Sequence, residues 1–125
     1  MKTKTNSKLL ESDIVGAVRL ALQRMRCTTW RNNVGMLRNE RGGWVRFGLC
    51  EGSSDFIGFT EYTVKPEDVG RNIAVFTAIE TKRPKGGSLT EEQETFINRV
   101  KQAGGIAGAA RTPLEATELI QEFKK

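Results

Sequence analysis

The segment Ile73–Lys82, which reads IAVFTAIETK, is the strongest strand signal in this chain of 125 residues. Apolar residues occupy both faces of its extended backbone, a pattern typical of a central strand that is covered on both sides. Side chains alternate between the two faces of a strand, so Glu80 and Lys82 share one face. The segment therefore predicts a buried strand that ends beside a carboxylate and an amine.

The residues that flank this strand alternate between helix and strand signals. A helix is expected from Ser7, its N-cap, to about Arg26, after a frayed start at residues 1–6. Downstream of the strand, Thr90–Gln93 has the form of a capping box that opens a second helix. The other expected elements are strands at 28–30, 44–47, 55–59 and 106–110 and a last helix from Pro113 to the C-terminus. This order predicts an α/β fold in one domain over residues 1–125.

The composition excludes several kinds of site. The chain has no histidine, which removes Ser-His-Asp and Cys-His nucleophiles and histidine-bound zinc. Its two cysteines, Cys27 and Cys50, are too few for a four-cysteine zinc site and favour a reducing, intracellular location. Because the sequence shows neither a signal peptide nor an apolar run long enough to cross a membrane, a cytoplasmic protein is expected.

The charge of the chain is unevenly distributed. The whole sequence carries 20 Lys and Arg against 15 Asp and Glu, a net charge of +5. Residues 1–50 have ten basic and three acidic side chains, a net of +7, whereas residues 51–80 have two basic and six acidic side chains, a net of −4. A basic surface around an acidic centre is typical of proteins that bind a polyanion, although it also fits a solvated surface with no partner.

Carboxylates near the end of the expected central strand form a candidate site. Asp55 begins a neighbouring strand, and if the two strands pair, Asp55, Glu80 and Lys82 converge at one end of the sheet. Two carboxylates and a backbone carbonyl suit Mg²⁺ or Mn²⁺, and either ion lowers the pKa of a bound water. Each residue also has a plainer interpretation: Glu80 and Lys82 as a solvated pair, Asp55 as a turn residue, Gln93 as half of the capping box, and Glu11 as an exposed glutamate in the first turn of a helix.

Five short motifs follow one another along the chain. They are Trp30–Gly35 (WRNNVG), Gly52–Gly58 (GSSDFIG), Ile79–Lys82 (IETK), Leu89–Phe96 (LTEEQETF) and Ala103–Gly105 (AGG). As a set they resemble the VRR-NUC (virus-type replication-repair nuclease) family, a branch of the PD-(D/E)XK nucleases, over residues 9–111. The resemblance implies a restriction-endonuclease-like core, with a central mixed sheet flanked by helices, and metal-dependent cleavage of DNA phosphodiester bonds.

The resemblance also implies roles for residues of the central motifs. Asp55 and Glu80 would bind Mg²⁺ or Mn²⁺, with the backbone carbonyl of Thr81 as a third ligand. Lys82 would position or activate the attacking water. Ser54 stands where the family motif has a proline, a mild departure because the aspartate carries the charge.

Two further site residues are carried over from the expected helices. Gln93 would lie beside the metal-binding set, at the start of the second helix. Glu11 would match the acidic residue of the first helix and would be a further candidate metal ligand, with Asp13 as the alternative.

Free-standing members of the family are similar to Holliday-junction resolvases and form symmetric dimers. The resemblance therefore implies a homodimer that cuts branched or four-way DNA with two active sites. Its DNA contacts would come from basic side chains, which hold phosphate without reading base sequence. The candidates are Arg19, Arg24, Arg26, Arg31, Arg38, Arg41, Arg46, Arg83 and Lys85. Two other interpretations stay open: a non-catalytic nucleic-acid-binding module that uses the basic surface alone, and a basic protein-interaction domain.

Overall fold

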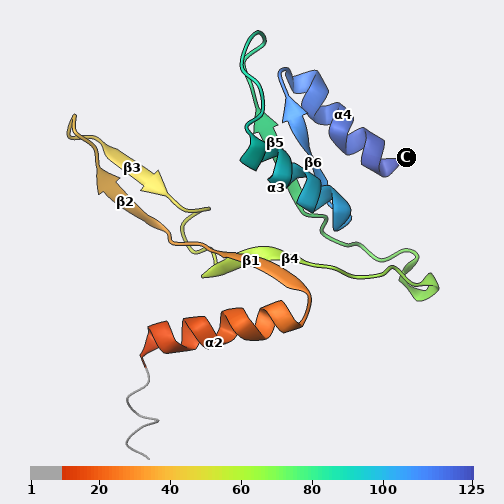
Figure 1. Ribbon diagram of the computed structural model, residues 1–125, viewed down its shortest axis with the longest axis horizontal. Coiled ribbons are helices and arrows are strands. Elements are labelled where there is room, and N and C mark those ends of the chain that lie inside the picture. Colours follow the sequence, from red (N-terminus) through yellow and green to blue (C-terminus); the bar gives the residue numbers. More distant parts are fainter. Residues whose placement is uncertain (1–9) are drawn as a thin grey trace, which may run out of the picture. The chain divides into compact units, whose positions relative to one another are not determined.

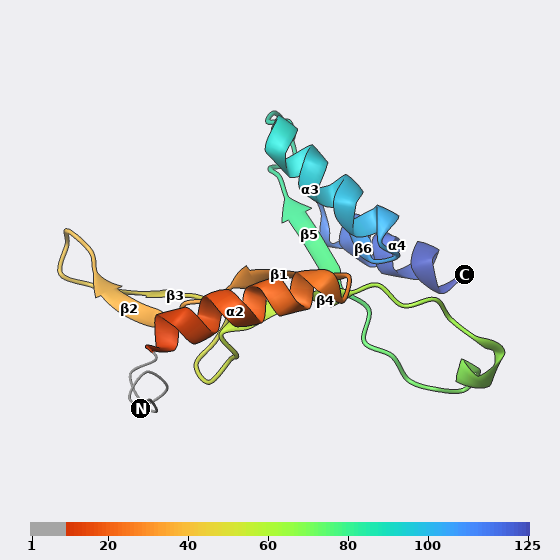
Figure 2. The ribbon, with the colours of Figure 1, turned by 60° about the horizontal axis from the view of Figure 1, so that its bottom comes forward.

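A computed structural model describes residues 10–125, which contain both helices and strands (Figures 1 and 2). The helices are α2 (Glu11–Arg24), α3 (Glu91–Gln102) and α4 (Pro113–Lys124), with a short 3-10 helix, η1, at Pro66–Asp68. The strands are β1 (Cys27–Arg31), β2 (Gly35–Arg38), β3 (Trp44–Phe47), β4 (Phe56–Thr60), β5 (Thr77–Thr81) and β6 (Ile106–Ala110). The mixed α/β composition is confirmed. None of the helices in residues 10–125 has the length and apolar character that a membrane span needs.

The chain divides into two compact units, Met1–Thr60 and Glu61–Lys125. The strands of the described residues form three two-stranded sheets, β1 with β4, β2 with β3, and β5 with β6. One continuous mixed sheet flanked by helices stays a prediction, as does a single nuclease domain over residues 1–125. The expected N-cap Ser7 and the frayed residues 1–6 lie outside the described residues.

In the first unit, α2 packs along the antiparallel pair of β1 and β4 (Figures 1 and 2). The ladder runs from Cys27 opposite Thr60 to Arg31 opposite Phe56. Gly58 is required in this ladder, because a Cβ there would lie 1.8 Å from the carbonyl oxygen of Thr28. The sheet therefore brings the segment that follows α2 beside the segment that follows residue 55.

A hairpin of β2 and β3 completes the first unit. Its turn is held by Asn39, whose Oδ1 accepts hydrogen bonds from the backbone N–H groups of Arg41 (3.0 Å) and Gly43 (2.8 Å). At the base of this turn the guanidinium of Arg38 lies 4.9 Å from the ring centre of Trp44, a cation–π distance. The strand at 44–47 was expected, whereas β2 was not.

The second unit is built on a parallel pair, β5 with β6, joined through α3. The register runs from Thr77 opposite Ile106 to Thr81 opposite Ala110, and the N–H of Lys82 donates to the Ala110 carbonyl at 3.0 Å. Parallel strands need a crossover connection, and α3 supplies it while packing on both strands. The carboxyl ends of β5 and β6 therefore lie at the same edge.

The buried apolar core of the described residues lies between α3 and β6. It consists of Ile97, Val100, Ile106, Ala107 and Ala110, of which Val100 is 1% exposed. Small residues in and next to β6 let the helices come close. A Cβ on Gly105 would lie 2.7 Å from Val100, and one on Gly108 would lie 2.8 Å from Leu119 of α4. This packing holds α3 and α4 against the strand pair.

The expectation of a strand over the whole of residues 73–82 is wrong, because only Thr77–Thr81 form β5. The length of the ladder is set by the partner strand: β6 has five residues, and its first residue, Ile106, already pairs with Thr77. The preceding apolar residue Ile73 is 58% exposed. Apolar character alone therefore overstated the strand, since pairing partners decide where a ladder begins.

The connection from β4 to β5 is organised by the carboxylate of Asp68. This carboxylate accepts hydrogen bonds from the Tyr62 hydroxyl (2.9 Å) and the Lys65 backbone N–H (2.9 Å), and it pairs with the Arg71 guanidinium. The Lys65 N–H, followed by the Tyr62 hydroxyl, lowers the pKa of Asp68 below its ordinary 3.8. The same contact with Asp68 raises the pKa of Tyr62.

The change Asp68→Asn is expected to lower the melting temperature at pH 7, because the amide cannot replace the charged acceptor of these bonds. A carboxyl whose pKa is lowered by folding stabilises the fold above its ordinary pKa, and loses that effect as the pH falls through the lowered value. The difference in melting temperature between wild type and Asp68→Asn should therefore narrow as the pH falls below 3.8. Thermal melts at pH 7 and at pH ~2.5 check this, and a constant difference would contradict it.

Candidate functional site

The end of β5 presents a carboxylate and an amine side by side. The Nζ atom of Lys82 lies 3.8 Å from Oε2 of Glu80, so the two side chains share a face as the strand alternation predicts. The Glu80 side chain is 35% exposed and that of Lys82 is 18% exposed. The Glu80 carboxylate is therefore partly accessible at the edge of the strand, and the largely buried Lys82 ammonium lies beside it.

The start of α3 is fixed by a reciprocal capping box. The Thr90 hydroxyl accepts from the backbone N–H of Gln93 at 3.1 Å, and Oε1 of Gln93 accepts from the backbone N–H of Thr90 at 2.9 Å. This confirms the capping interpretation of Gln93. Its place beside a metal site stays a prediction.

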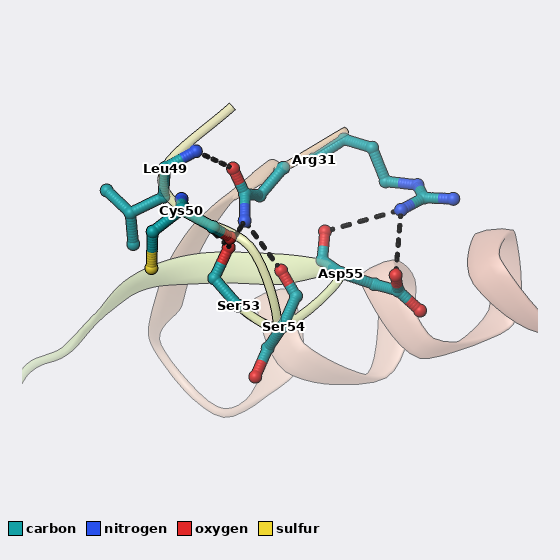
Figure 3. A network of polar contacts seen from close by, with 7 residues as sticks. Arg31, Leu49, Cys50, Ser53, Ser54 and Asp55 are labelled. Atoms are coloured by element: carbon teal, nitrogen blue, oxygen red, sulfur yellow. Dashed lines mark hydrogen bonds and ion pairs between the residues drawn. The ribbon is translucent and has the colours of Figure 1, made fainter. Parts of the chain in front are cut away.

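Asp55 occupies the position just before β4 in the first unit. Its Oδ1 lies 3.5 Å from Nη1 of Arg31, and the same nitrogen donates to the Asp55 carbonyl oxygen at 3.4 Å (Figure 3). The Asp55 side chain is 68% exposed. The carboxylate is therefore accessible, with one cationic neighbour across the β1–β4 pair.

The loop that leads into Asp55 is held by Asn32, directly after β1. Its Nδ2 donates to the Ser53 hydroxyl (2.7 Å) and the Ser54 carbonyl (2.9 Å), while its Oδ1 accepts from the Leu49 N–H (2.9 Å). The Asn32 backbone N–H donates to the Asp55 carbonyl at 2.7 Å. Figure 3 draws the side-chain contacts to Leu49, Ser53 and Ser54 as dashed lines. The sequence assigned no functional role to Asn32, and its place in the Trp30–Gly35 motif was the available signal.

The acidic residues of α2 differ in their roles. Asp13 caps the helix, because its Oδ2 accepts from the Leu10 backbone N–H at 3.2 Å. Glu11 is the first residue of the helix and is exposed. Asp13 is therefore engaged in helix capping, and the choice between Glu11 and Asp13 as the acidic site residue stays a prediction.

Several basic side chains of the candidate set contact aromatic rings or carboxylates. The guanidiniums of Arg19 and Arg31 each lie 5.8 Å from the ring centre of Phe56, next to Asp55. On the hairpin, Arg46 lies 3.5 Å from the carboxylate of Glu51. Arg38 lies over the ring of Trp44. The remaining members lie at the end of α2, on the hairpin or in the loop after β5, namely Arg24, Arg26, Arg41, Arg83 and Lys85. These positions allow phosphate binding in each unit.

The oxygen donors fit a hard divalent cation. Carboxylates such as those of Asp55 and Glu80, together with a backbone carbonyl such as that of Thr81, are the ligands that Mg²⁺ and Mn²⁺ prefer. Within residues 10–125, three or more His, Cys, Asp or Glu side chains do not gather into one metal-binding group. The assignment of Asp55, Glu80 and Thr81 to one metal site stays a prediction.

Comparison with known protein families gave a match. The family model described as VRR-NUC domain matches residues 8–112. The comparisons with curated proteins and with solved structures gave no match. The matched span contains all the residues of the candidate site and ends before α4.

The role of Gln93 in the capping box predicts that one substitution destabilises the protein and another does not. Gln93→Ala removes the acceptor for the Thr90 N–H and should lower the free energy of unfolding by about 0.5–1 kcal/mol. Gln93→Glu should keep the stability of wild type, because a carboxylate accepts the same hydrogen bond and suits the helix N-terminus. Urea unfolding measures both, with Gln102→Ala at the exposed end of α3 as the control. Equal destabilisation by both Gln93 variants would contradict the capping role.

Proposed function

We propose, because this chain belongs to the VRR-NUC family, that it is a divalent-metal-dependent endonuclease that hydrolyses phosphodiester bonds of DNA. Membership of the family implies nuclease activity, which is a hydrolase activity. The observation that carries the proposal is the match over residues 8–112, which spans Glu11, Asp55, Glu80, Lys82 and Gln93.

The metal is held by the carboxylates of Asp55 and Glu80 and by the carbonyl of Thr81. Support comes from the hard oxygen chemistry of these donors and from the accessibility of both carboxylates. A bound Mg²⁺ or Mn²⁺ supplies a water of lowered pKa and neutralises charge on a phosphate oxygen. Glu11 is the acidic residue of the first helix in this assignment and the further candidate ligand, since Asp13 caps α2.

Lys82 orients the attacking water and stabilises the negative charge that develops on the phosphate. Its ammonium lies 3.8 Å from the Glu80 carboxylate, so it is held at the edge of β5 where that carboxylate is presented. A fixed cation beside a developing oxyanion lowers the barrier without reorganising at the moment of reaction. Gln93 completes the catalytic set from the first turn of α3.

The DNA is bound through its phosphates. The candidate basic residues lie near Phe56, on the exposed hairpin and in the loop after β5, and the hairpin also exposes Trp44. Arginine binds phosphate through two parallel N–H donors, and such contacts position a duplex without reading its bases. Binding is therefore selective for DNA structure rather than for sequence.

The substrate is a branched or four-way junction, and the enzyme acts as a homodimer. A chain of 125 residues offers one active site, whereas symmetric resolution of a junction needs two cuts. A two-fold dimer supplies two sites related by the symmetry of the substrate.

Both cysteines, Cys27 and Cys50, are free, which supports action in the reducing cytoplasm.

Purified protein is expected to cut synthetic four-way junctions faster than flaps or linear duplexes when Mg²⁺ or Mn²⁺ is present, and to cut nothing in EDTA. Asp55→Asn, Glu80→Gln and Lys82→Ala should each slow cleavage by about 10²-fold or more, because each removes a charge that is proposed to act on the transition state. Gel assays with end-labelled DNA measure the rates.

The matched control for these variants is Glu118→Gln, which neutralises a carboxylate on α4 outside the candidate site. It should cut at the wild-type rate. Cleavage in EDTA, or full activity in Glu80→Gln, would overturn the proposed mechanism. Salt-sensitive DNA binding with no cleavage at any metal concentration would support the non-catalytic binding module instead.

A further inference from the structure

The loop between β5 and α3 is held in place by one arginine that follows β6. Arg111, the residue directly after β6, donates three side-chain hydrogen bonds to loop carbonyls. Its Nη1 donates to the carbonyls of Arg83 and Gly86, and its Nη2 donates to that of Gly87, each at 2.7 Å. We call residues 83–87 the β5–α3 loop. The planar fork of a guanidinium can bridge several acceptors in this way, whereas an ammonium is a single point.

The position of Arg111 follows from the parallel strand pair. Thr81 lies opposite Ala110, so the residues that follow them, Lys82 and Arg111, leave the sheet at the same edge. The backbone N–H of Arg111 donates to Oε1 of Glu115 at 2.7 Å, in the first turn of α4. The guanidinium is therefore anchored to β6 and α4 while it holds the loop that begins one residue after Lys82.

The β5–α3 loop needs such an anchor. Gly86 and Gly87 both have positive φ angles, 76° and 68°, in succession. Glycines in this region have great conformational freedom in the absence of other restraints. Arg83 and Lys85 are exposed on this loop. Fixing the loop backbone therefore fixes the places from which two cations extend into solvent.

We propose that Arg111 is a positioning residue for DNA binding. It does not contact DNA itself, because its guanidinium is engaged by the three loop carbonyls. It holds the β5–α3 loop so that Arg83 and Lys85 meet phosphates next to the bond on which Glu80 and Lys82 act. This inference rests on the proposed function, since it assigns the loop to the same nucleic-acid interface.

The test measures equilibrium binding of a fluorescein-labelled four-way junction in EDTA, by fluorescence anisotropy at several salt concentrations. It compares wild type, Arg111→Lys, the loop variant Arg83→Ala/Lys85→Ala, and the combination of all three changes. Arg111→Lys keeps the net charge but cannot bridge the loop carbonyls. It should nevertheless lower the slope of log affinity against log salt, by about one for each phosphate that the loop cations no longer neutralise.

The combination of changes separates positioning from a direct contact. Once the two loop cations are gone, Arg111→Lys should have little further effect. If the effects were independent, the two separate decreases in affinity would multiply. The combined variant should bind at least about threefold more tightly than that product. The control is Arg99→Lys, which keeps a cation beside Glu61, the partner of Arg99 at 3.1 Å, and should bind as wild type. Thermal melts accompany each variant.

The positioning role would be overturned if the affinity decreases of Arg111→Lys and the loop variant multiply, or if Arg111→Lys keeps the wild-type salt slope. Neither result would overturn the proposed function. A general loss of structure would appear as a lowered melting temperature with affinity decreases that multiply, so it also counts against the proposal. Failure of the wild type to bind the junction would overturn the proposed function together with this inference. Because the assay contains EDTA, lack of cleavage does not affect its outcome.

Discussion

The parallel pairing of β5 with β6 is the constraint on which the second unit depends. It lets α3 pack over the strands and places Val100 in the core, where it is 1% exposed. It also fixes the edge at which both strands end, because parallel strands finish on the same side. The chemistry-bearing residues Glu80, Lys82 and Arg111 lie at or beside that edge. Packing and candidate function in this unit therefore share one cause.

The first unit is organised by polar contacts rather than by a buried core. None of residues 10–60 is fully buried, yet Asn32 and Asn39 each tie a loop or turn to a strand end. Asparagine suits this task because its amide both donates and accepts. In the case of Asn32 the contacts place Asp55 at the start of β4, beside Arg31. Polar contacts therefore fix the position of the Asp55 carboxylate, whereas strand pairing fixes the position of Glu80.

The parts of this molecule that could be predicted from the sequence are those set by neighbours in the chain. The capping box at Thr90 and the shared face of Glu80 and Lys82 need only local spacing, and both are confirmed. The start of β5 was missed because it depends on the length of β6, a strand on the far side of α3 in the sequence. The role of Arg111 depends likewise on carbonyls far away in the sequence. Five ordered motifs identified the family, which the match over residues 8–112 confirms, while the joint metal site of Asp55 and Glu80 stays a prediction.

The central claim, that the carboxylates of Asp55 and Glu80 hold a divalent metal, is tested most directly by binding of Mn²⁺ without DNA. Electron paramagnetic resonance of free Mn²⁺ gives the dissociation constant for wild type, Asp55→Asn, Glu80→Gln and the control Glu118→Gln. The account predicts that either site variant binds at least about tenfold more weakly, and that the control binds as wild type. Wild-type affinity in either Asp55→Asn or Glu80→Gln would contradict the claim.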